Sequence, residues 1–175
     1  MISKNSGIWI SSRTRFFSFT ELAYKAYKGC YTALAIVDLD NFKHINDNYG
    51  HQIGDKVIQL TGRTILTTLG LPPIGEFDIS EWKATNILPI PGRLGGDEFI
   101  IAVLNKQNRA EVQELFENLL ARLNAIRIDH TQLTGIQASI GIAENLSEDL
   151  DSAYKRADEA LYASKRAGKN RISFA

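Results

Sequence analysis

Hydrophobic positions along the chain follow two patterns, one typical of buried strands and one typical of amphipathic helices. The stretch from Thr32 to Val37 is almost continuously apolar, which predicts a strand buried on both faces. The segment from Gln52 to Leu69 places apolar residues three and four positions apart, as expected of a helix with one buried face. Further helices are predicted over residues 19–28 with Thr20 as N-cap, 41–48, a segment that begins after Asn108, and 149–167.

Glycines divide another apolar stretch into a predicted hairpin. We expect a strand from Ile87 to Leu94, a turn over residues 95–98 and a second strand over residues 99–104. Residues 136–142 alternate in polarity, which predicts a half-buried, central strand. Hairpins mixed with helices favour an α+β fold, in which helices pack on a central mixed, mainly antiparallel sheet.

Composition narrows the class of protein. A chain of 175 residues with 44% hydrophobic and 23% charged residues is expected to fold as one globular domain. Its net charge of zero does not favour nucleic-acid binding. With Cys30 as the only cysteine, no intrachain disulfide can form, and no apolar stretch approaches the roughly 20 residues needed to span a bilayer. We therefore expect a cytoplasmic or cytosol-facing domain without a membrane segment.

Two acidic segments carry the candidate chemistry. The sequence Arg-Leu-Gly-Gly-Asp-Glu-Phe at residues 93–99 puts two carboxylates directly after a double glycine. Asp38-Leu39-Asp40 places further carboxylates at the end of the apolar strand. Glycines allow a nucleotide to approach the backbone closely, and carboxylate oxygens suit hard cations such as Mg²⁺. Together the segments predict a metal-dependent phosphoryl-transfer centre.

Several blocks, in order, resemble the GGDEF-domain diguanylate cyclases over nearly the whole chain. The blocks are Asp38 to Asp47, Tyr49 to His51, Gly54-Asp55, Arg93 to Phe99, Ser139 to Ala143, and Ala157 to Tyr162 followed by Lys165, Gly168, Asn170 and Arg171. The resemblance implies an enzyme that joins two GTP into cyclic di-GMP with release of two pyrophosphates. It also implies a fold like the palm of class III nucleotide cyclases, a homodimer in catalysis, and Mg²⁺ as cofactor with Mn²⁺ as a substitute. The sequence identifies no sensor or flanking domain.

The same resemblance assigns roles to individual residues. It implies a metal shell of Asp38, the Leu39 carbonyl, Asp97 and Glu98, with Asp97 and Glu98 as the catalytic pair, Asp97 also being the implied base, and Asp40 structural. Guanine recognition carries over to Asn46 and Asp55, with His51 nearby. Lys165 and Lys169 match phosphate contacts and are expected one helical turn apart on one face. Gly95 and Gly96 are expected to lie against the substrate.

Some alternatives stay open at this point. Asn46 and Asp55 also suit helix capping, and the two lysines suit a solvated helix end. The protein as a whole is alternatively a non-catalytic GTP-binding regulatory module, against which the intact Asp38, Asp97 and Glu98 count. A third alternative is a cyclase that makes a different product from GTP or from a GTP/ATP pair.

The chain also departs from the family pattern. The family's N-terminal signature has no clear counterpart before Arg15, so Arg93 is expected to lack its usual acidic partner. Asn86 and Pro89 occupy the positions of the charged product-inhibition motif, which predicts that this site is absent. We divide the chain into an N-terminal segment with a leading helix (residues 1–30) and a GGDEF domain (residues 31–175) with a proline-rich insertion at about 71–86.

Overall fold

The computed structural model describes residues 11–26, 31–71, 89–106, 108–145 and 150–175. Its strands are β1 (Ser11–Ser12), β2 (Tyr31–Leu39), β3 (Ile90–Gly95), β4 (Glu98–Lys106), β5 (Ala138–Glu144) and β6 (Ile172–Phe174). Its helices are α1 (Arg13–Ala26), α2 (Phe42–Tyr49), α3 (His51–Thr68), α4 (Arg109–Asn124) and α5 (Leu150–Arg166).

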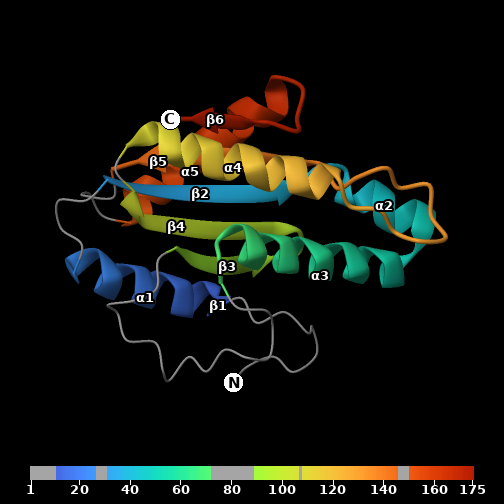
Figure 1. Cartoon of the computed structure of the whole chain (residues 1–175), viewed down its shortest axis with the longest axis horizontal. Coiled ribbons are helices and arrows are strands. Elements are labelled where there is room, and N and C mark those ends of the chain that lie inside the picture. The colour runs from blue at the N-terminus through green and yellow to red at the C-terminus, as the bar shows by residue number, and fades with distance from the viewer. Residues whose placement is uncertain (1–10, 27–30, 72–88, 107, 146–149) are drawn as a thin grey trace.

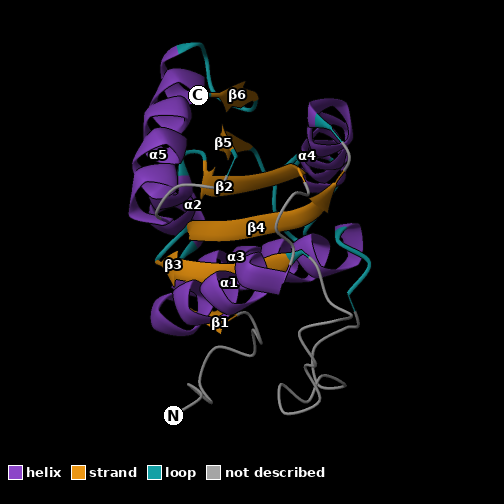
Figure 2. Cartoon of the chain, turned by 90° about the vertical axis from the view of Figure 1, so that its left-hand side faces the viewer, coloured by secondary structure: helices purple, strands orange, loops and turns teal. Residues whose placement is uncertain are grey.

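Within these residues the strands form one six-stranded sheet in the order β1-β3-β4-β2-β5-β6. The inner pairs β3–β4, β4–β2 and β2–β5 are antiparallel, whereas β1 and β6 add to the two edges in parallel. Helices α1 and α5 cover one face, and α3 and α4 cover the other (Figures 1 and 2). The predicted α+β fold with a mixed, mainly antiparallel sheet is confirmed.

Strand β2 lies in the middle of the sheet and supplies side chains to two separate cores. Ala33, Ala35 and Val37 face the core beneath α3 and α4, whereas Leu34 and Ile36 face the core beneath α1 and α5. A strand buried on both faces needs apolar residues at every position, which is why its sequence is a continuous hydrophobic run. The prediction for this strand is confirmed, and the strand continues through Asp38 to Leu39.

Helix α5 packs very closely on β5. The small residues along one stripe of this helix are buried: Ala153, Ala157, Ala160 and Ser164. A Cβ added at Gly141 of β5 would overlap the Ala157 carbonyl oxygen and the Leu161 backbone nitrogen. Small residues on both elements therefore let the helix lie directly on the strand, and this contact fixes the position of the C-terminal end of α5.

Two predictions about local structure are wrong. The leading helix begins at Arg13, and the Thr20 hydroxyl donates to the Phe16 carbonyl at 2.8 Å, so Thr20 lies inside the helix and is not its N-cap. Strand β5 begins at Ala138 and is buried on both faces, because its small residues, Ser139 and Gly141 among them, pack under α5 and do not face solvent.

The remaining boundaries agree with expectation within a few residues. Asn108 caps α4 by accepting a hydrogen bond from the Glu111 backbone N–H at 3.1 Å, as predicted. The predicted hairpin forms from β3 and β4, although Ile87 lies outside the described residues. No helix in the described part of the chain is long and apolar enough to cross a membrane.

Candidate active site

The two acidic segments meet because β2 and β4 are neighbours in the sheet. Asp38 lies directly opposite Glu98 in the antiparallel register. One residue further on, the Leu39 N–H donates to the Asp97 carbonyl oxygen at 3.3 Å. The end of β2 and the hairpin turn thus lie side by side, and the four positions predicted as metal ligands, Asp38, Leu39, Asp97 and Glu98, share one end of the sheet.

Burial and neighbouring carboxylates disfavour the ionised forms of Asp38 and Glu98 at this end of the sheet. Burial raises the pKa of Asp38, an effect that Lys165 opposes and that Asp97 and Asp40 reinforce. Burial also raises the pKa of Glu98, with further contributions from Asp38 and Asp97. Raised pKa values mean that the folded chain disfavours the ionised carboxylates. A bound cation would favour the ionised forms by attracting both carboxylates.

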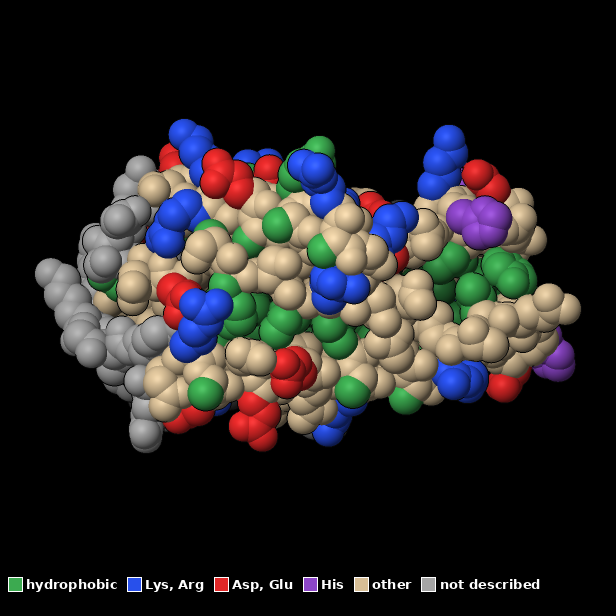
Figure 3. Space-filling model, turned by 90° about the horizontal axis from the view of Figure 1, so that it is seen from above, with side chains coloured by type: hydrophobic (Ala, Val, Ile, Leu, Met, Phe, Trp, Pro, Cys, Tyr) green, Lys and Arg blue, Asp and Glu red, His purple; other side chains and the backbone are tan. Residues whose placement is uncertain are grey.

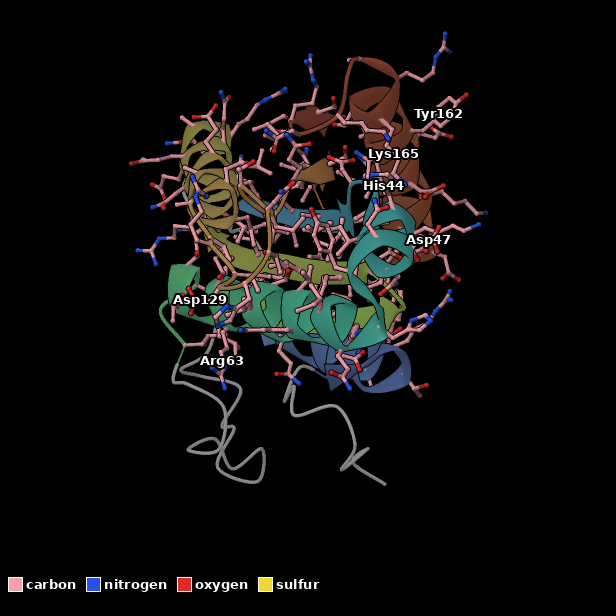
Figure 4. All side chains as sticks on the ribbon, turned by 90° about the vertical axis from the view of Figure 1, so that its right-hand side faces the viewer. His44, Asp47, Arg63, Asp129, Tyr162 and Lys165 are labelled. Carbon is pink, nitrogen blue, oxygen red and sulfur yellow. The ribbon has the colours of Figure 1, made fainter. Side chains whose placement is uncertain are left out.

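The donor chemistry at this site fits a divalent metal ion. Carboxylate and carbonyl oxygens are the ligands that Mg²⁺ prefers, and Asp38, Asp97, Glu98 and the Leu39 carbonyl supply both kinds. Among the described residues, however, no three acidic, histidine or cysteine side chains already form a compact metal cluster. The Lys165 ammonium instead contacts the Asp38 Oδ2 atom at 2.8 Å. Figure 4 shows Lys165 projecting from α5 above α2 in that view.

The two lysines predicted as phosphate contacts do not share a helical face. Helix α5 ends at Arg166, and Lys169 and Asn170 adopt left-handed backbone conformations with φ of 64° and 46°. The Lys169 ammonium donates to the Asn41 Oδ1 atom at 2.7 Å. The expectation of one turn on one face is therefore wrong, because Gly168 ends the helix before Lys169. Lys165 nevertheless contacts Asp38 near the end of β2, and Lys169 contacts Asn41 in the turn that follows β2.

Asp40 holds this C-terminal loop against the sheet. Its carboxylate is buried and accepts hydrogen bonds from the Ser139 hydroxyl at 2.8 Å and from the Asn170 backbone N–H at 2.9 Å. The Asn170 side chain in turn accepts from the Asn124 amide at 3.0 Å. Asp40 is thus occupied by protein donors, which agrees with the structural role expected from the sequence.

The residues predicted to recognise guanine lie on α2 and α3. Asn46 is half-buried within α2, whereas His51 and Asp55 are exposed in the first turns of α3. The turn at Gly50 joins the helices, since the Gly50 N–H donates to the Asn46 carbonyl. Asn46 and Asp55 lie inside their helices, and neither helix has a side-chain hydrogen bond that caps its N-terminus. The capping alternative is therefore wrong for both residues.

The glycine turn is open, and Arg93 braces it. Gly95 and Gly96 have φ of 153° and 51°, and a Cβ built on either meets no atom within 4 Å among the described residues. The Arg93 guanidinium donates to the Gly96 carbonyl from Nε at 3.1 Å and from Nη2 at 2.6 Å. Glycine here supplies the backbone conformation that the turn requires and leaves space beside it.

Arg93 was expected to lack its usual acidic partner, and the structure shows which charges surround it. Burial lowers the pKa of Arg93, and the charges of Asp55 and Asp97 raise it. The arginine is thus close to both the hairpin turn and Asp55 in the first turns of α3, and the sequence alone predicted no bracing role for it. Its position two residues before the double glycine is the signal that could have identified it.

Asp158 on α5 was also missed, although it belongs to the matching block at residues 157–162. Its charge raises the pKa values of Glu98 and Tyr154, so it contributes to the negative electrostatic potential at this end of the molecule.

On the face seen in Figure 3, acidic and basic side chains are interspersed. That surface therefore presents no continuous basic path for a nucleic-acid backbone.

Comparisons with known proteins agree with this arrangement. The family model described as "Diguanylate cyclase, GGDEF domain" matches residues 10–71 and 84–171, and it leaves out part of the proline-rich stretch. The biofilm architecture maintenance protein MbaA of Vibrio cholerae is 36% identical over 143 residues, covering 79% of this chain and 17% of that protein. Diguanylate cyclase DgcP of Escherichia coli is 36% identical over 136 residues, covering 76% of this chain and 35% of that protein.

A solved structure gives the same result at the level of the fold. The GGDEF domain of DgcB from Caulobacter crescentus, crystallised in complex with c-di-GMP, has a TM-score of 0.76 at 26% identity and covers 99% of this chain and 96% of that one. The chain spans about a third or less of the length of the curated relatives named above. The family match, these relatives and the shared fold show that this chain belongs to the GGDEF diguanylate cyclase family.

Proposed function

We propose that this domain joins two molecules of GTP into cyclic di-GMP. In each half-reaction the ribose 3′-oxygen of one GTP attacks the α-phosphorus of the other, its proton leaves, and the bond to pyrophosphate breaks. Two such steps close the ring and release two pyrophosphates. The observation that carries this proposal is Asp38 opposite Glu98, with Asp97 on the adjoining open glycine turn.

The proposed cofactor is Mg²⁺, with Mn²⁺ as a substitute. Asp38, the Leu39 carbonyl, Asp97 and Glu98 would hold it. When bound, it supplies stabilisation of the negative charge that develops on the attacking oxygen and on the departing pyrophosphate. The raised pKa values of Asp38 and Glu98 support this assignment, because crowded buried carboxylates gain most from a cation.

The protein's own groups would bind and orient the substrate. We assign guanine recognition to Asn46 and Asp55, since a carboxylate accepts from the N1–H and 2-amino groups of guanine while an amide both donates and accepts. Adenine would leave these groups unpaired. His51 lies in the same turn, and we place it beside the base.

Lys165 and Lys169 would contact the triphosphate, and the open turn at Gly95 and Gly96 admits it. Asp97 would accept the proton of the 3′-hydroxyl. Arg93 contributes indirectly by fixing the Gly96 carbonyl and thus the shape of the turn.

We further propose that two copies of the domain face each other in an antiparallel dimer, each holding one GTP. The chemistry supports this, because one site binds one substrate and the reaction needs two. The use of GTP and the single Cys30 support a location on the cytosolic side. Identification by mass spectrometry of the products formed from GTP and Mg²⁺ tests the function.

Loss of feedback inhibition is a further part of the proposal. Pro89 is buried immediately before β3, where the family pattern has a carboxylate, and Asn86 lies outside the described residues. Neither side chain can supply the charges of an Arg-x-x-Asp motif. We expect added cyclic di-GMP, at concentrations equal to the substrate, to leave the initial rate unchanged within about twofold, a change worth under about 0.5 kcal/mol.

Initial rates with and without added product, together with calorimetry of product binding, check this expectation. Tight binding of cyclic di-GMP that lowers the rate would contradict it. Inhibition relieved by raising the GTP concentration would instead indicate ordinary competition at the substrate site.

A further inference from the structure

Gly54 is a buried glycine between the two residues assigned to guanine recognition. It lies in the first turns of α3, next to Asp55, and α3 follows directly after α2, which carries Asn46 (Figure 1). An ideal Cβ built on Gly54 would overlap the Asn46 Oδ1 atom, would lie 2.9 Å from the Asn46 Cγ atom and would lie 3.3 Å from the Phe42 ring. The amide of Asn46 therefore occupies the space that any other residue at position 54 would fill.

Backbone hydrogen bonds hold the two positions together independently of their side chains. The Gly50 N–H donates to the Asn46 carbonyl at 2.9 Å, and the Gly54 N–H donates to the Gly50 carbonyl at 3.2 Å. Gly50 adopts φ of 82°, which lets the chain pass directly from α2 into α3. Because the backbone fixes the spacing, a side chain at position 54 must displace the Asn46 amide and cannot simply move away from it.

We infer that Gly54 is a specificity-determining positioning residue, whose missing side chain creates the seat for the Asn46 amide beside Asp55. This inference rests on the proposed function, since it concerns how the same site selects guanine. Glycine is otherwise unfavourable inside a helix, where alanine is preferred. A buried interior glycine with normal helical conformation thus needs a packing reason, and the overlap with Asn46 supplies it.

The positioning role of Gly54 can be tested separately from folding, because of the atoms that a methyl group at this position would displace. They belong to the end of a flexible, half-buried side chain and not to backbone, so the amide can rotate away at little cost. The Gly54→Ala variant should therefore fold with a melting temperature equal to or above that of the wild type. It should lose only the orientation of the Asn46 amide.

Calorimetry of GTP binding to the purified chain, with Ca²⁺ in place of Mg²⁺ to prevent turnover, tests the inference through a double-mutant cycle. We expect Gly54→Ala to weaken GTP binding about tenfold, as Asn46→Ala does, because both remove one well-placed hydrogen-bonding group. In the Asn46→Ala background, adding Gly54→Ala should change GTP binding by less than about twofold. Gln59→Ala, an exposed position on the same helix, serves as the control with unchanged binding.

A second variant keeps the inference testable if Gly54→Ala does not fold. Asn46→Gln retains the amide but moves it outward by one methylene, while Gly54 is unchanged. It should weaken GTP binding about as much as Asn46→Ala. Because a change in specificity is expected, ATP binding should change less than about twofold in all of these variants.

The possible outcomes separate this inference from the proposed function. Wild-type binding of GTP with loss in Gly54→Ala and no further loss in the double variant supports the inference. Unchanged GTP binding by a folded Gly54→Ala or by Asn46→Gln overturns it, as do additive effects in the cycle, while the proposed function stands. Absence of GTP binding by the wild-type chain overturns both.

Discussion

Asp38→Asn should abolish cyclic di-GMP formation while leaving the fold intact. The substitution preserves shape but removes the charge of the residue that lies opposite Glu98. Loss of one anionic ligand in a site where the cation stabilises developing charge is worth several kcal/mol, so we expect the rate to fall by about 1,000-fold or more. Mass spectrometry of the product at fixed GTP and Mg²⁺ measures this.

Although Asp38→Asn should lose activity, its free energy of unfolding should stay the same or rise. Burial and the neighbouring Asp97 and Asp40 raise the pKa of Asp38 above its unfolded value. The folded state therefore disfavours the ionised form, and a neutral side chain of the same shape should not lower the free energy of unfolding. Asp129→Asn, at an exposed loop position away from Lys165 (Figure 4), is the matched control with full activity. Retention of more than a tenth of the activity by Asp38→Asn would contradict the metal assignment.

Lys165→Met should weaken GTP binding and at the same time strengthen metal binding in the absence of nucleotide. The lysine is assigned to the triphosphate, so its loss should cost about tenfold or more in GTP affinity. In the structure, however, its ammonium contacts the Asp38 Oδ2 atom at 2.8 Å. Removing that competing cation leaves Asp38 free for the metal, and we expect Mn²⁺ to bind about tenfold more tightly.

Mn²⁺ titrations followed by electron paramagnetic resonance, with and without a GTP analogue, measure both effects. Lys169→Met is the matched control, because Lys169 contacts the neutral Asn41 amide and not a carboxylate. It should weaken GTP binding without changing the affinity for Mn²⁺ alone. Unchanged or weaker Mn²⁺ binding by Lys165→Met would show that the ion pair with Asp38 does not compete with the metal.

The hydrophobic pattern correctly predicted elements whose own buried side chains are apolar. Strand β2 was predicted correctly because a continuous run of apolar residues in a short segment requires burial on both faces. Strand β5 was misjudged for the complementary reason. Ser139 and Gly141 look solvent-facing in an alternating pattern, yet they are small because α5 packs directly on them.

The errors at helix ends have equally local causes. Thr20 has a side chain suited to an N-cap, but its hydroxyl bonds to the Phe16 carbonyl one turn earlier in the same helix. For Lys169, a helical spacing from Lys165 was assumed across Gly168, which itself ends the helix. The helix ends at Arg166, before Gly168, despite the helical spacing of the two lysines. Lys169 and Asn170, which follow, adopt left-handed backbone conformations.

The site depends on information that periodicity does not contain. That Asp38 lies opposite Glu98 follows from the strand order β4-β2-β5, which brings together segments far apart in the chain. The family resemblance predicted that the acidic segments act together, but not the Lys165–Asp38 contact or the Arg93 brace. Those contacts depend on side-chain positions that only the folded arrangement determines.

The most direct test is to incubate the purified chain with GTP and Mg²⁺ at several protein concentrations and to identify the products by mass spectrometry. We predict cyclic di-GMP with two pyrophosphates per product, a rate that rises faster than linearly with protein concentration, and loss of product in Asp97→Ala. GTP that binds but is unchanged at the highest protein concentration would contradict catalysis by this chain and favour a GTP-binding regulatory module.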